Sequence, residues 1–422
     1  MGKKFKKNVP LLRFPEFSKP WLIKSVSALV KENFIYKPLD GNHGNLHPTS
    51  FDYVKSGIPF VMSNDIQDGV INYSKCHYIS EDLARSLQKG FSKEGDVLLT
   101  HKGTVGEVAI VNKTAFPFIM LTPQVTYYRV KNPKLLSNLF LASLFISHNF
   151  QRMLKVLAAG GTRPYIGITE QGKLTISIPS LAEQEKIASF LGAIDTRLNQ
   201  LRRKQELLQT YKRGIMQKLF SQELRFKQDD GSDFPDWEEK TLGEISKIKR
   251  GASPRPISSP IWFSTKSEIG WVRISDVTKS NKYLEETEQY LSEAGIKKSR
   301  FVPYGNLIMS ICATIGKPII TKMDVCIHDG FVVFEKLQED ITFIYFLLTN
   351  IEVNWQKYGQ PGIQVNLNTD IVSNESVLLP CLEEQEKIAN FLTAIDRKIE
   401  TLSRQIKQTE QFKKGLLQKM FV

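Results

Sequence analysis

Residues 179–220 read PSLAEQEKIASFLGAIDTRLNQLRRKQELLQTYKRGIMQKLF, and residues 380–421 read PCLEEQEKIANFLTAIDRKIETLSRQIKQTEQFKKGLLQKMF. The second stretch repeats the first without insertions at an offset of 201 residues, which takes Gln184 to Gln385. A long variable stretch precedes each copy, so the chain is built twice. A duplication of this kind predicts two similar sites held at a fixed separation.

Each copy predicts one long helix, which begins near Leu181 in the first copy. Ser180 and Glu183 have the spacing of a capping box, in which the hydroxyl and the carboxylate satisfy exposed backbone N–H groups. Cys381 replaces the serine in the second copy, which predicts a weaker cap there. Beyond the cap, one position in every three or four forms a seam of the kind that pairs helices in coiled coils. The seam positions are Ile187, Leu191, Ile194, Leu198, Leu201, Gln205, Leu208, Lys212, Ile215 and Leu219 in the first copy, and Ile388, Leu392, Ile395, Ile399, Leu402, Ile406, Thr409, Lys413, Leu416 and Met420 in the second.

Polar residues interrupt each seam, at Gln205 and Lys212 in the first copy and at Thr409 and Lys413 in the second. Polar seam positions tend to fix register and partner rather than add stability. A helix of this length spans roughly 60 Å at about 1.5 Å per residue, which is more than one globular core covers. We therefore expect the two helices to pack against each other.

The stretches before the two helices share an order of signals. Each opens with Phe-Pro, an acidic residue and an aromatic residue, then has a short apolar run that ends at a glycine turn, and then an apolar helical run. The apolar run before the turn predicts a buried strand with a tight connection. These segments span residues 14–17, 96–106 and 135–157 in the first stretch and 234–237, 306–316 and 341–358 in the second. The residues within this order differ widely, which predicts two related but non-identical ligands.

Composition indicates the kind of ligand. The chain has 57 Lys and Arg against 44 Asp and Glu, a formal net charge of +13 and a pI near 9.3. Such an excess attracts polyanions, so nucleic acid is the first candidate. A membrane is the second, but the sequence has no uninterrupted run of about 18 apolar residues. The four cysteines lie far apart without a CxxC pair, which suits a reducing compartment and neither a disulfide framework nor a zinc site.

The sequence predicts no catalytic residue and no metal site. His43 and His47 are four residues apart, but glycines and a proline surround them, so a surface loop explains them better than a metal-binding helix face. Gly103 and Gly106 lack the Gly-Lys-Ser/Thr that completes a phosphate-binding loop. The acidic residues within 236–240 are too crowded to hold Mg²⁺ as a nuclease does.

Three features together resemble the specificity subunit of type I restriction–modification enzymes. They are the repeated Glu-Gln-Glu-Lys-Ile-Ala helix starts (183–188 and 384–389), the Gln-Lys-x-Phe helix ends (217–220 and 418–421) and the Phe-Pro-acidic-aromatic openings. The resemblance covers nearly the whole chain. It implies an α+β fold with two mixed α/β target-recognition domains, separated by two long helices that pack as an antiparallel coiled coil with a pseudo-twofold internal repeat. The implied segments are an N-terminal target-recognition domain (1–178), a central conserved helix (179–226), a C-terminal target-recognition domain (227–379) and a C-terminal conserved helix (380–422).

The same resemblance implies a function. Such subunits are cytoplasmic, do not bind membranes, and read a bipartite double-stranded DNA target with one domain per half-site. They direct two methyltransferase (modification) subunits and two restriction (motor–nuclease) subunits to that target, and are not enzymes themselves. No cofactor is expected in this chain, whereas S-adenosylmethionine, ATP and Mg are expected on the partner subunits. Two alternatives stay open: a stand-alone architectural DNA-binding protein that tethers two sites through a coiled coil, and an enzyme with an unrecognised active site.

Polar side chains in loops and near predicted strand ends are the candidate DNA contacts, because a rigid scaffold can hold loop residues whose identities vary. The candidates for base contacts are Asn64, His101, Lys102, Thr104, Arg163 and Tyr165 in the first domain, and Arg273, Ser275, Thr314, His328, Gln364 and Asn366 in the second. The candidates for phosphate contacts are Lys249, Arg250, Arg255, Lys297, Lys298 and Arg300. For each residue the alternative is an ordinary solvated side chain.

Apolar residues largely off the helix seam are the candidates for binding a partner subunit, because a docking subunit needs an outward apolar strip. They are Phe190, Tyr211, Met216, Phe220, Phe391, Phe412 and Leu417. The alternative is that these side chains widen the face buried between the two helices.

Overall fold

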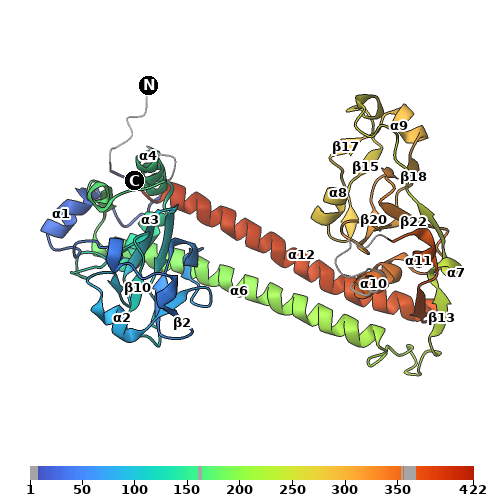
Figure 1. Ribbon diagram of the computed structural model, residues 1–422, viewed down its shortest axis with the longest axis horizontal. Coiled ribbons are helices and arrows are strands. Elements are labelled where there is room, and N and C mark those ends of the chain that lie inside the picture. Colours follow the sequence, from blue (N-terminus) through green and yellow to red (C-terminus); the bar gives the residue numbers. More distant parts are fainter. Residues whose placement is uncertain (1–7, 160–163, 353–354, 356–366) are drawn as a thin grey trace. The chain divides into compact units, whose positions relative to one another are not determined.

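The computed structural model describes residues 8–159, 164–352, 355 and 367–422. Internal contacts divide the chain into two units, the first made of residues 1–202 and 404–422 and the second of residues 203–403. Each unit contains small sheets, short helices and part of both long helices, α6 (Leu181–Phe220) and α12 (Leu382–Lys419) (Figure 1). The fold predicted from the sequence, two α/β domains with two long packed helices, is confirmed.

The first unit forms four sheets from its twelve strands among the described residues, in the orders β1-β12, β2-β6-β3-β10-β7, β11-β8-β9 and β4-β5. Its strands are β1 (Leu22–Ser25), β2 (Tyr53–Val54), β3 (Ile58–Val61), β4 (Ile66–Gln67), β5 (Val70–Ile71), β6 (His77–Ile79), β7 (Phe91–Ser92), β8 (Val97–Lys102), β9 (Thr104–Ile110), β10 (Ile119–Leu121), β11 (Val125–Tyr128) and β12 (Thr175–Ile178). Its helices before α6 are α1 (Val26–Lys31), η1 (Gly44–Leu46), η2 (Ser50–Asp52), η3 (Ser63–Asp65), α2 (Glu81–Ser86), α3 (Asn138–Ile146), α4 (His148–Ala158) and α5 (Ile168–Gln171).

The second unit has sheets in the orders β13-β23, β14-β22-β19-β20-β16 and β17-β15-β21-β18. Its strands are β13 (Glu238–Thr241), β14 (Lys247–Arg250), β15 (Gly270–Val272), β16 (Tyr283–Leu284), β17 (Gln289–Tyr290), β18 (Arg300–Val302), β19 (Leu307–Ser310), β20 (Pro318–Thr321), β21 (Val325–Ile327), β22 (Phe331–Glu335) and β23 (Ser376–Leu379). Its short helices are α7 (Leu242–Ile245), η4 (Pro260–Trp262), α8 (Ile274–Lys279), α9 (Glu293–Lys297), α10 (Ile341–Ile351) and α11 (Thr369–Ser373).

An antiparallel strand pair joins each domain to a long helix. β1 pairs with β12 in the first unit, and β13 pairs with β23 in the second. Because β12 and β23 lead directly into α6 and α12, each pair fixes the helix start against the first strand of its domain. The buried strands predicted before the glycine turns are β8, in which only the last residue is exposed, and β19, which is buried throughout.

The predicted helical runs differ from the observed helices. The run over 135–157 divides at Ser147, whose hydroxyl accepts from the amide of Phe150 and so starts the new helix α4. In the second unit α10 ends at Ile351, and residues 353–354 and 356–366 lie outside the described residues. Periodicity alone does not mark the break, because Ser147 fits a polar position within an amphipathic helix as well as it fits a cap.

The two long helices run antiparallel in each unit. In the first unit Lys413 pairs with Asp195 at 2.5 Å, and the seam residues of α6 from Ile187 to Leu198 share a core with Leu416 of α12 and with Met420, which follows it. In the second unit Lys212 pairs with Asp396 at 2.6 Å, at the equivalent positions. The polar seam residues therefore bind across the helix pair, except that the Thr409 hydroxyl bonds back to Gln405 in its own helix.

The predicted capping role of Glu183 is wrong. Its buried carboxylate accepts from Nε and Nη2 of Arg13, both at 2.7 Å, and from Nε1 of Trp21 at 3.1 Å. Glu384 binds Arg225 and Trp237 in the same way in the second unit. A bidentate hydrogen bond from a guanidinium to a buried carboxylate is stronger than a local bond to a backbone amide. This explains why Glu183 binds the distant Arg13 rather than the backbone of its own helix start.

Aromatic contacts relate the openings of the two units. Phe14 packs edge-on against Phe190, and Phe226 packs edge-on against the equivalent Phe391. The ammonium of Lys186 also lies over the Phe14 ring, and that of the equivalent Lys387 lies over Phe234. The two contacts of Phe14 are therefore divided in the second unit between Phe226, which follows the arginine, and Phe234 of the Phe-Pro opening. The second unit has more residues between the arginine and its tryptophan, which separates these two phenylalanines.

Candidate nucleic-acid interface

The candidate site of the first unit lies where β8 turns into β9. Lys102 ends β8, Thr104 begins β9, and Tyr165 crosses this edge through a backbone bridge to Lys102. The ammonium of Lys102 lies 6.0 Å from the centre of the Tyr165 ring. Asn64 is exposed in η3, whose Ser63 hydroxyl lies beside Gly103 of the turn. The structure thus brings these predicted residues to one edge, whereas Arg163 lies outside the described residues.

His101 is a buried residue of β8 next to this edge. Only 1% of the residue is exposed, and Nδ1 lies 2.9 Å from the carbonyl oxygen of Ile166, so Nδ1 carries the hydrogen. Burial lowers the pKa of the imidazole, which keeps it neutral near pH 7. His101 therefore positions the segment that carries Tyr165, rather than presenting an imidazole to solvent.

A hollow of about 280 Å³ adjoins this edge, lined in part by His43, His47, Lys102 and Gln124. Oε1 of Gln124 accepts from the Ser63 hydroxyl at 2.9 Å, which leaves its amide NH₂ group as a donor. The loop interpretation of His43 and His47 stands, but that loop forms one wall of the hollow. No pattern in the sequence marked Gln124.

Asp40 holds the side chain of His43, which lines this hollow. Its carboxylate is almost fully buried, accepts from Lys89, and lies 2.7 Å from Nε2 of His43. Burial would raise the pKa of Asp40, but the hydrogen bonds from Lys89 and His43 outweigh it and lower the pKa. Asp40 therefore stays ionised and holds two cationic or donor side chains near the edge of the sheet.

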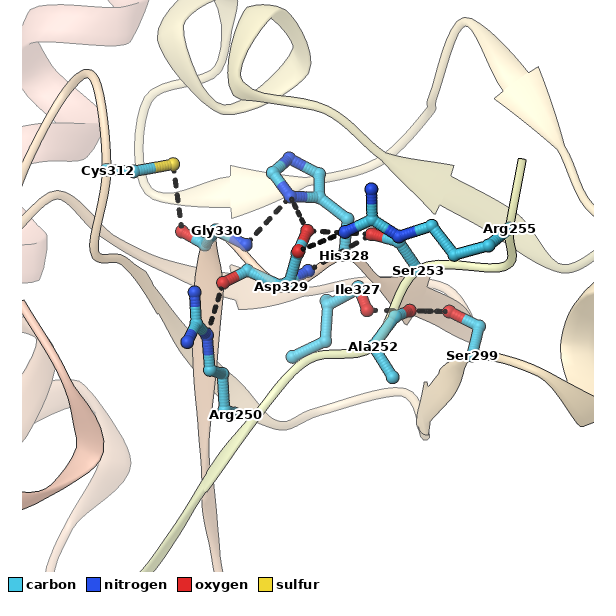
Figure 2. Close-up of polar contacts among 10 residues, drawn as sticks. All are labelled: Arg250, Ala252, Ser253, Arg255, Ser299, Cys312, Ile327, His328, Asp329 and Gly330. Atoms are coloured by element: carbon cyan, nitrogen blue, oxygen red, sulfur yellow. Dashed lines mark hydrogen bonds and ion pairs between the residues drawn. The ribbon is translucent and has the colours of Figure 1, made fainter. Parts of the chain in front are cut away.

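The candidate site of the second unit is centred on the turn His328–Gly330 between β21 and β22 (Figure 2). The Asp329 carboxylate accepts from the Ser253 hydroxyl at 2.7 Å and from Nη2 of Arg255 at 3.0 Å. The carbonyl oxygen of Asp329 accepts from Nε of Arg250 at 2.7 Å. Two of the predicted phosphate contacts, Arg250 and Arg255, are therefore held by one turn. Asp329 itself was missed, because an acidic residue has the wrong charge for a phosphate contact.

The imidazole of His328 has one defined tautomer in this turn. Nδ1 accepts from the amide of Gly330 at 2.8 Å, so the hydrogen of the neutral ring is on Nε2. Burial lowers the pKa of His328, which favours that neutral form. A Cβ on Gly330 would lie 2.4 Å from the imidazole and from Sγ of Cys312, so the turn needs glycine at this place. Nε2 is thus left as a single N–H donor (Figure 2).

A broad hollow of about 660 Å³ lies beside this turn and is lined by Arg273, Ser275, Glu288, Gln289 and His328. Nε of Arg273 donates to Oε1 of Gln289 at 3.2 Å. Three predicted residues are therefore brought together: Arg273 and Ser275, which are two positions apart, and the distant His328. Glu288 and Gln289 were missed, because no strand or turn signal singled them out.

The remaining predicted contacts of this unit lie on β14 and β18, at the end of α9 and in the loop after β19. Arg300 is half-buried and donates from Nε to the carbonyl of Arg250 at 3.1 Å, while Lys249 lies 3.6 Å from Glu335. Lys297 and Lys298 are exposed at the end of α9, and Thr314 is partly exposed in the loop after β19. Gln364 and Asn366 lie outside the described residues. Across the described part of the chain, no cluster of three or more His, Cys, Asp or Glu residues could hold a metal ion.

The predicted partner-binding residues fall into two groups. Tyr211 and Phe412 occupy equivalent positions of the two helices and are 50% and 56% exposed, and Phe190 is 36% exposed. Met216 is buried in the core of the second unit. Phe220, Phe391 and Leu417 are partly buried and pack against the cores of their units. Tyr211 and Phe412 are therefore the better candidates for an outward contact, and Met216 contributes to packing.

Comparison with known proteins agrees with this architecture. Residues 42–209 and 235–411 match the family model described as type I restriction modification DNA specificity domain. The MjaVIII specificity subunit of a type I restriction enzyme from Methanocaldococcus jannaschii is 26% identical over 388 residues, which cover 86% of this chain and 88% of that protein. The putative MjaX specificity subunit of the same organism is 25% identical over 383 residues, 86% of both chains.

Two solved structures share the fold. The S subunit of a type I restriction–modification system from M. genitalium superposes with a TM-score of 0.58 at 15% identity, over 98% of this chain and 99% of that one. A chain from a structural study of complex assembly and conformational transition of the type I R-M system superposes with a TM-score of 0.60 at 17% identity, over 94% and 96%. No described helix is both long enough and apolar enough to span a membrane.

Proposed function

This chain belongs to the type I restriction–modification DNA specificity family and is the target-recognition component of such a system, and we propose that it reads a bipartite duplex sequence, one half-site with each unit. The observation that carries this proposal is the duplicated scaffold with two different hollows. Both units place polar and cationic side chains at a turn that follows a buried strand, but the residues differ. Equivalent scaffolds with different donors and acceptors suit two different short DNA sequences.

Recognition is assigned to residues 1–178 and 227–379, and spacing and subunit docking to residues 179–226 and 380–422. Arg250 and Arg255 would contact phosphates, because their charges attract the backbone without reading sequence. The side chains that would contact base edges are Lys102, Tyr165, Gln124, Arg273 and His328. The support for these roles is chemical, because each of these side chains offers hydrogen-bond donors at a sheet edge that a duplex can approach.

The chain supplies specificity and not catalysis. Two methyltransferase subunits would dock on the long helices, and two restriction subunits would join the restricting complex. S-adenosylmethionine, ATP and Mg would be bound by those subunits, in the cytoplasm where the DNA is. A stand-alone tether would need no outward aromatic residues, so the exposed Tyr211 and Phe412 favour a docking subunit.

The test is methylome sequencing of the native host with and without this chain, and with residues 14–178 replaced by those of another family member. Deletion should abolish methylation of one bipartite motif. The replacement should change one half of that motif and leave the other intact. If the exchanged complex assembles and both halves change, each domain does not read its own half-site. Unaltered methylation after deletion would exclude a role in modification.

A further inference from the structure

The hollow of the second unit contains an acidic side chain on a surface that the proposed function places against DNA. Glu288 is exposed, and its carboxylate pairs with Lys279 rather than with Arg273. A carboxylate close to DNA is repelled by phosphates, so it is tolerated where a cation pairs with it, as Lys279 does, and favourable where a base donates a hydrogen bond to it. In the major groove, the donor that pairs with Glu is the N4 amino group of cytosine.

Arg273 provides the complementary donors in the same hollow. Its Nε is committed to Oε1 of Gln289 at 3.2 Å, so the remaining N–H groups are on the two terminal nitrogens. A guanidinium with both terminal nitrogens available matches O6 and N7 of guanine, the commonest specific contact to a base. The bond to Gln289 limits the rotation of the guanidinium and so reduces the entropy lost on binding.

One buried residue holds both sides of this hollow. Asp276 is 5% exposed, and its carboxylate accepts from the amide of Arg273 at 2.8 Å and from the amide of Glu288 at 3.3 Å. The main chains that carry the donor and the acceptor are therefore fixed relative to each other. Such a fixed donor–acceptor pair can select both bases of one pair.

Resting on the proposed function, we propose that this hollow reads one G·C base pair in the half-site of the second unit, with Arg273 bound to guanine and Glu288 bound to cytosine. His328, with its single N–H on Nε2, would contact an acceptor of the neighbouring base or of the backbone. Asp276 acts as a positioning residue through the two main-chain amides.

The experiment is methylome sequencing of the native host that carries the chain as Arg273→Gln or as Glu288→Gln. Each variant should relax the requirement at the same G·C pair by roughly 5- to 150-fold, the range for losing one good base contact. All other specified positions should be unchanged. The matched control is Glu286→Gln, an exposed acidic residue two positions before Glu288 that does not line the hollow, which should leave the motif intact.

Three results would overturn this inference while leaving the proposed function in place. The first is a motif without a G·C pair in that half-site. The second is relaxation at two different positions. The third is a uniform loss of methylation with Arg273→Gln at unchanged specificity, which would make Arg273 a phosphate contact. If no bipartite motif depends on the chain at all, the proposed function fails as well.

Discussion

At the scale of single residues, a buried glutamate organises each unit. Glu183 and Glu384 are 1% and 0% exposed, and each binds one arginine and one tryptophan that precede the first strand of the domain. The neighbouring glutamines extend this network: Gln184 accepts from the amide of Ser137, and Gln385 accepts from the amide of Asp340. The Glu-Gln pair of the repeated helix start therefore joins the domain opening, the long helix and the start of α3 or α10.

Truncation of Glu384 should destabilise the chain severely. Glu384→Ala leaves the half-buried guanidinium of Arg225 and the indole N–H of Trp237 without their acceptor, and removing one partner of such a pair costs about 3 kcal/mol or more. Chemical denaturation monitored by tryptophan fluorescence measures the loss. Glu386→Ala, an exposed neighbour on the same helix, should change the unfolding free energy by less than about 0.5 kcal/mol. Equal effects of the two substitutions would contradict the role given to Glu384.

His101 predicts a pH dependence of stability. Its folded-state pKa lies below its ordinary value of 6.5, because burial disfavours the charged ring. The unfolded chain therefore binds more protons than the folded chain below about pH 6.5, and the unfolding free energy should fall as pH falls from there towards the folded-state pKa. His47 and His328 shift in the same direction, so they add to the effect.

The variant His101→Asn should show a smaller difference in unfolding free energy between pH 7 and pH 5 than the parent chain. His148→Asn, at an exposed position, is the control and should keep the parent's dependence. An unchanged slope in His101→Asn would show that the buried imidazole does not titrate in this range.

At the scale of elements, the long helices have a paired seam and two exposed aromatic residues at equivalent positions. The seam is covered within each unit, whereas Tyr211 and Phe412 are half exposed. Aromatic residues of this kind commonly supply most of the binding energy at protein interfaces.

The double variant Tyr211→Ser/Phe412→Ser should lose the methyltransferase subunit. Truncation of one aromatic hot spot costs about 2 kcal/mol, which is about 30-fold in affinity, so the loss of both should lower affinity by more than 30-fold, while stability should change little. Co-purification from the native host measures binding, and denaturation measures stability. The control is Lys204→Ser/Gln405→Ser, an exposed and equivalent pair on the same helices. Retention of the methyltransferase by the aromatic double variant would move the docking surface elsewhere.

At the scale of the whole molecule, the repeat predicts that the helices set the spacing of the two half-sites. Half-sites read from one face of the duplex should lie about one helical turn, roughly 10 base pairs, centre to centre. The reciprocal pairs Asp195–Lys413 and Lys212–Asp396 fix the register of α6 against α12. A change in length therefore needs matched insertions to keep both pairs.

Insertion of Ala-Ala-Glu-Ala after Leu201 and again after the equivalent Leu402 should lengthen both helices by about 6 Å and rotate their far ends by about 40°. At about 3.4 Å per base pair, the unspecified gap should grow by one or two base pairs while both half-sites survive. Methylome sequencing reads the gap directly. The single insertion after Leu201 should fail to assemble, because it breaks the register. An active double-insertion variant with an unchanged gap would show that the helices do not measure DNA.

The sequence by itself determined the duplication, the start of the first long helix near Leu181, the seam and the buried strands β8 and β19. Each depends on a local pattern: a repeat, a period of three and four, or an apolar run that ends at glycine. The polar seam residues also predicted a fixed register, which the reciprocal Lys–Asp pairs then provide.

Only the tertiary structure decided which polar groups meet. Glu183 has the spacing of a capping residue, yet it binds Arg13 from a distant part of the chain. Residues 404–422 follow the second unit in sequence but belong to the first unit. There the amide of Leu12 donates to the carbonyl oxygen of Lys419. Arg273, Glu288 and His328 meet in one hollow because β15, β17 and β21 are neighbours in one sheet. Strand order and long-range charge pairing are set by burial across the whole fold, and no window of the sequence contains that information.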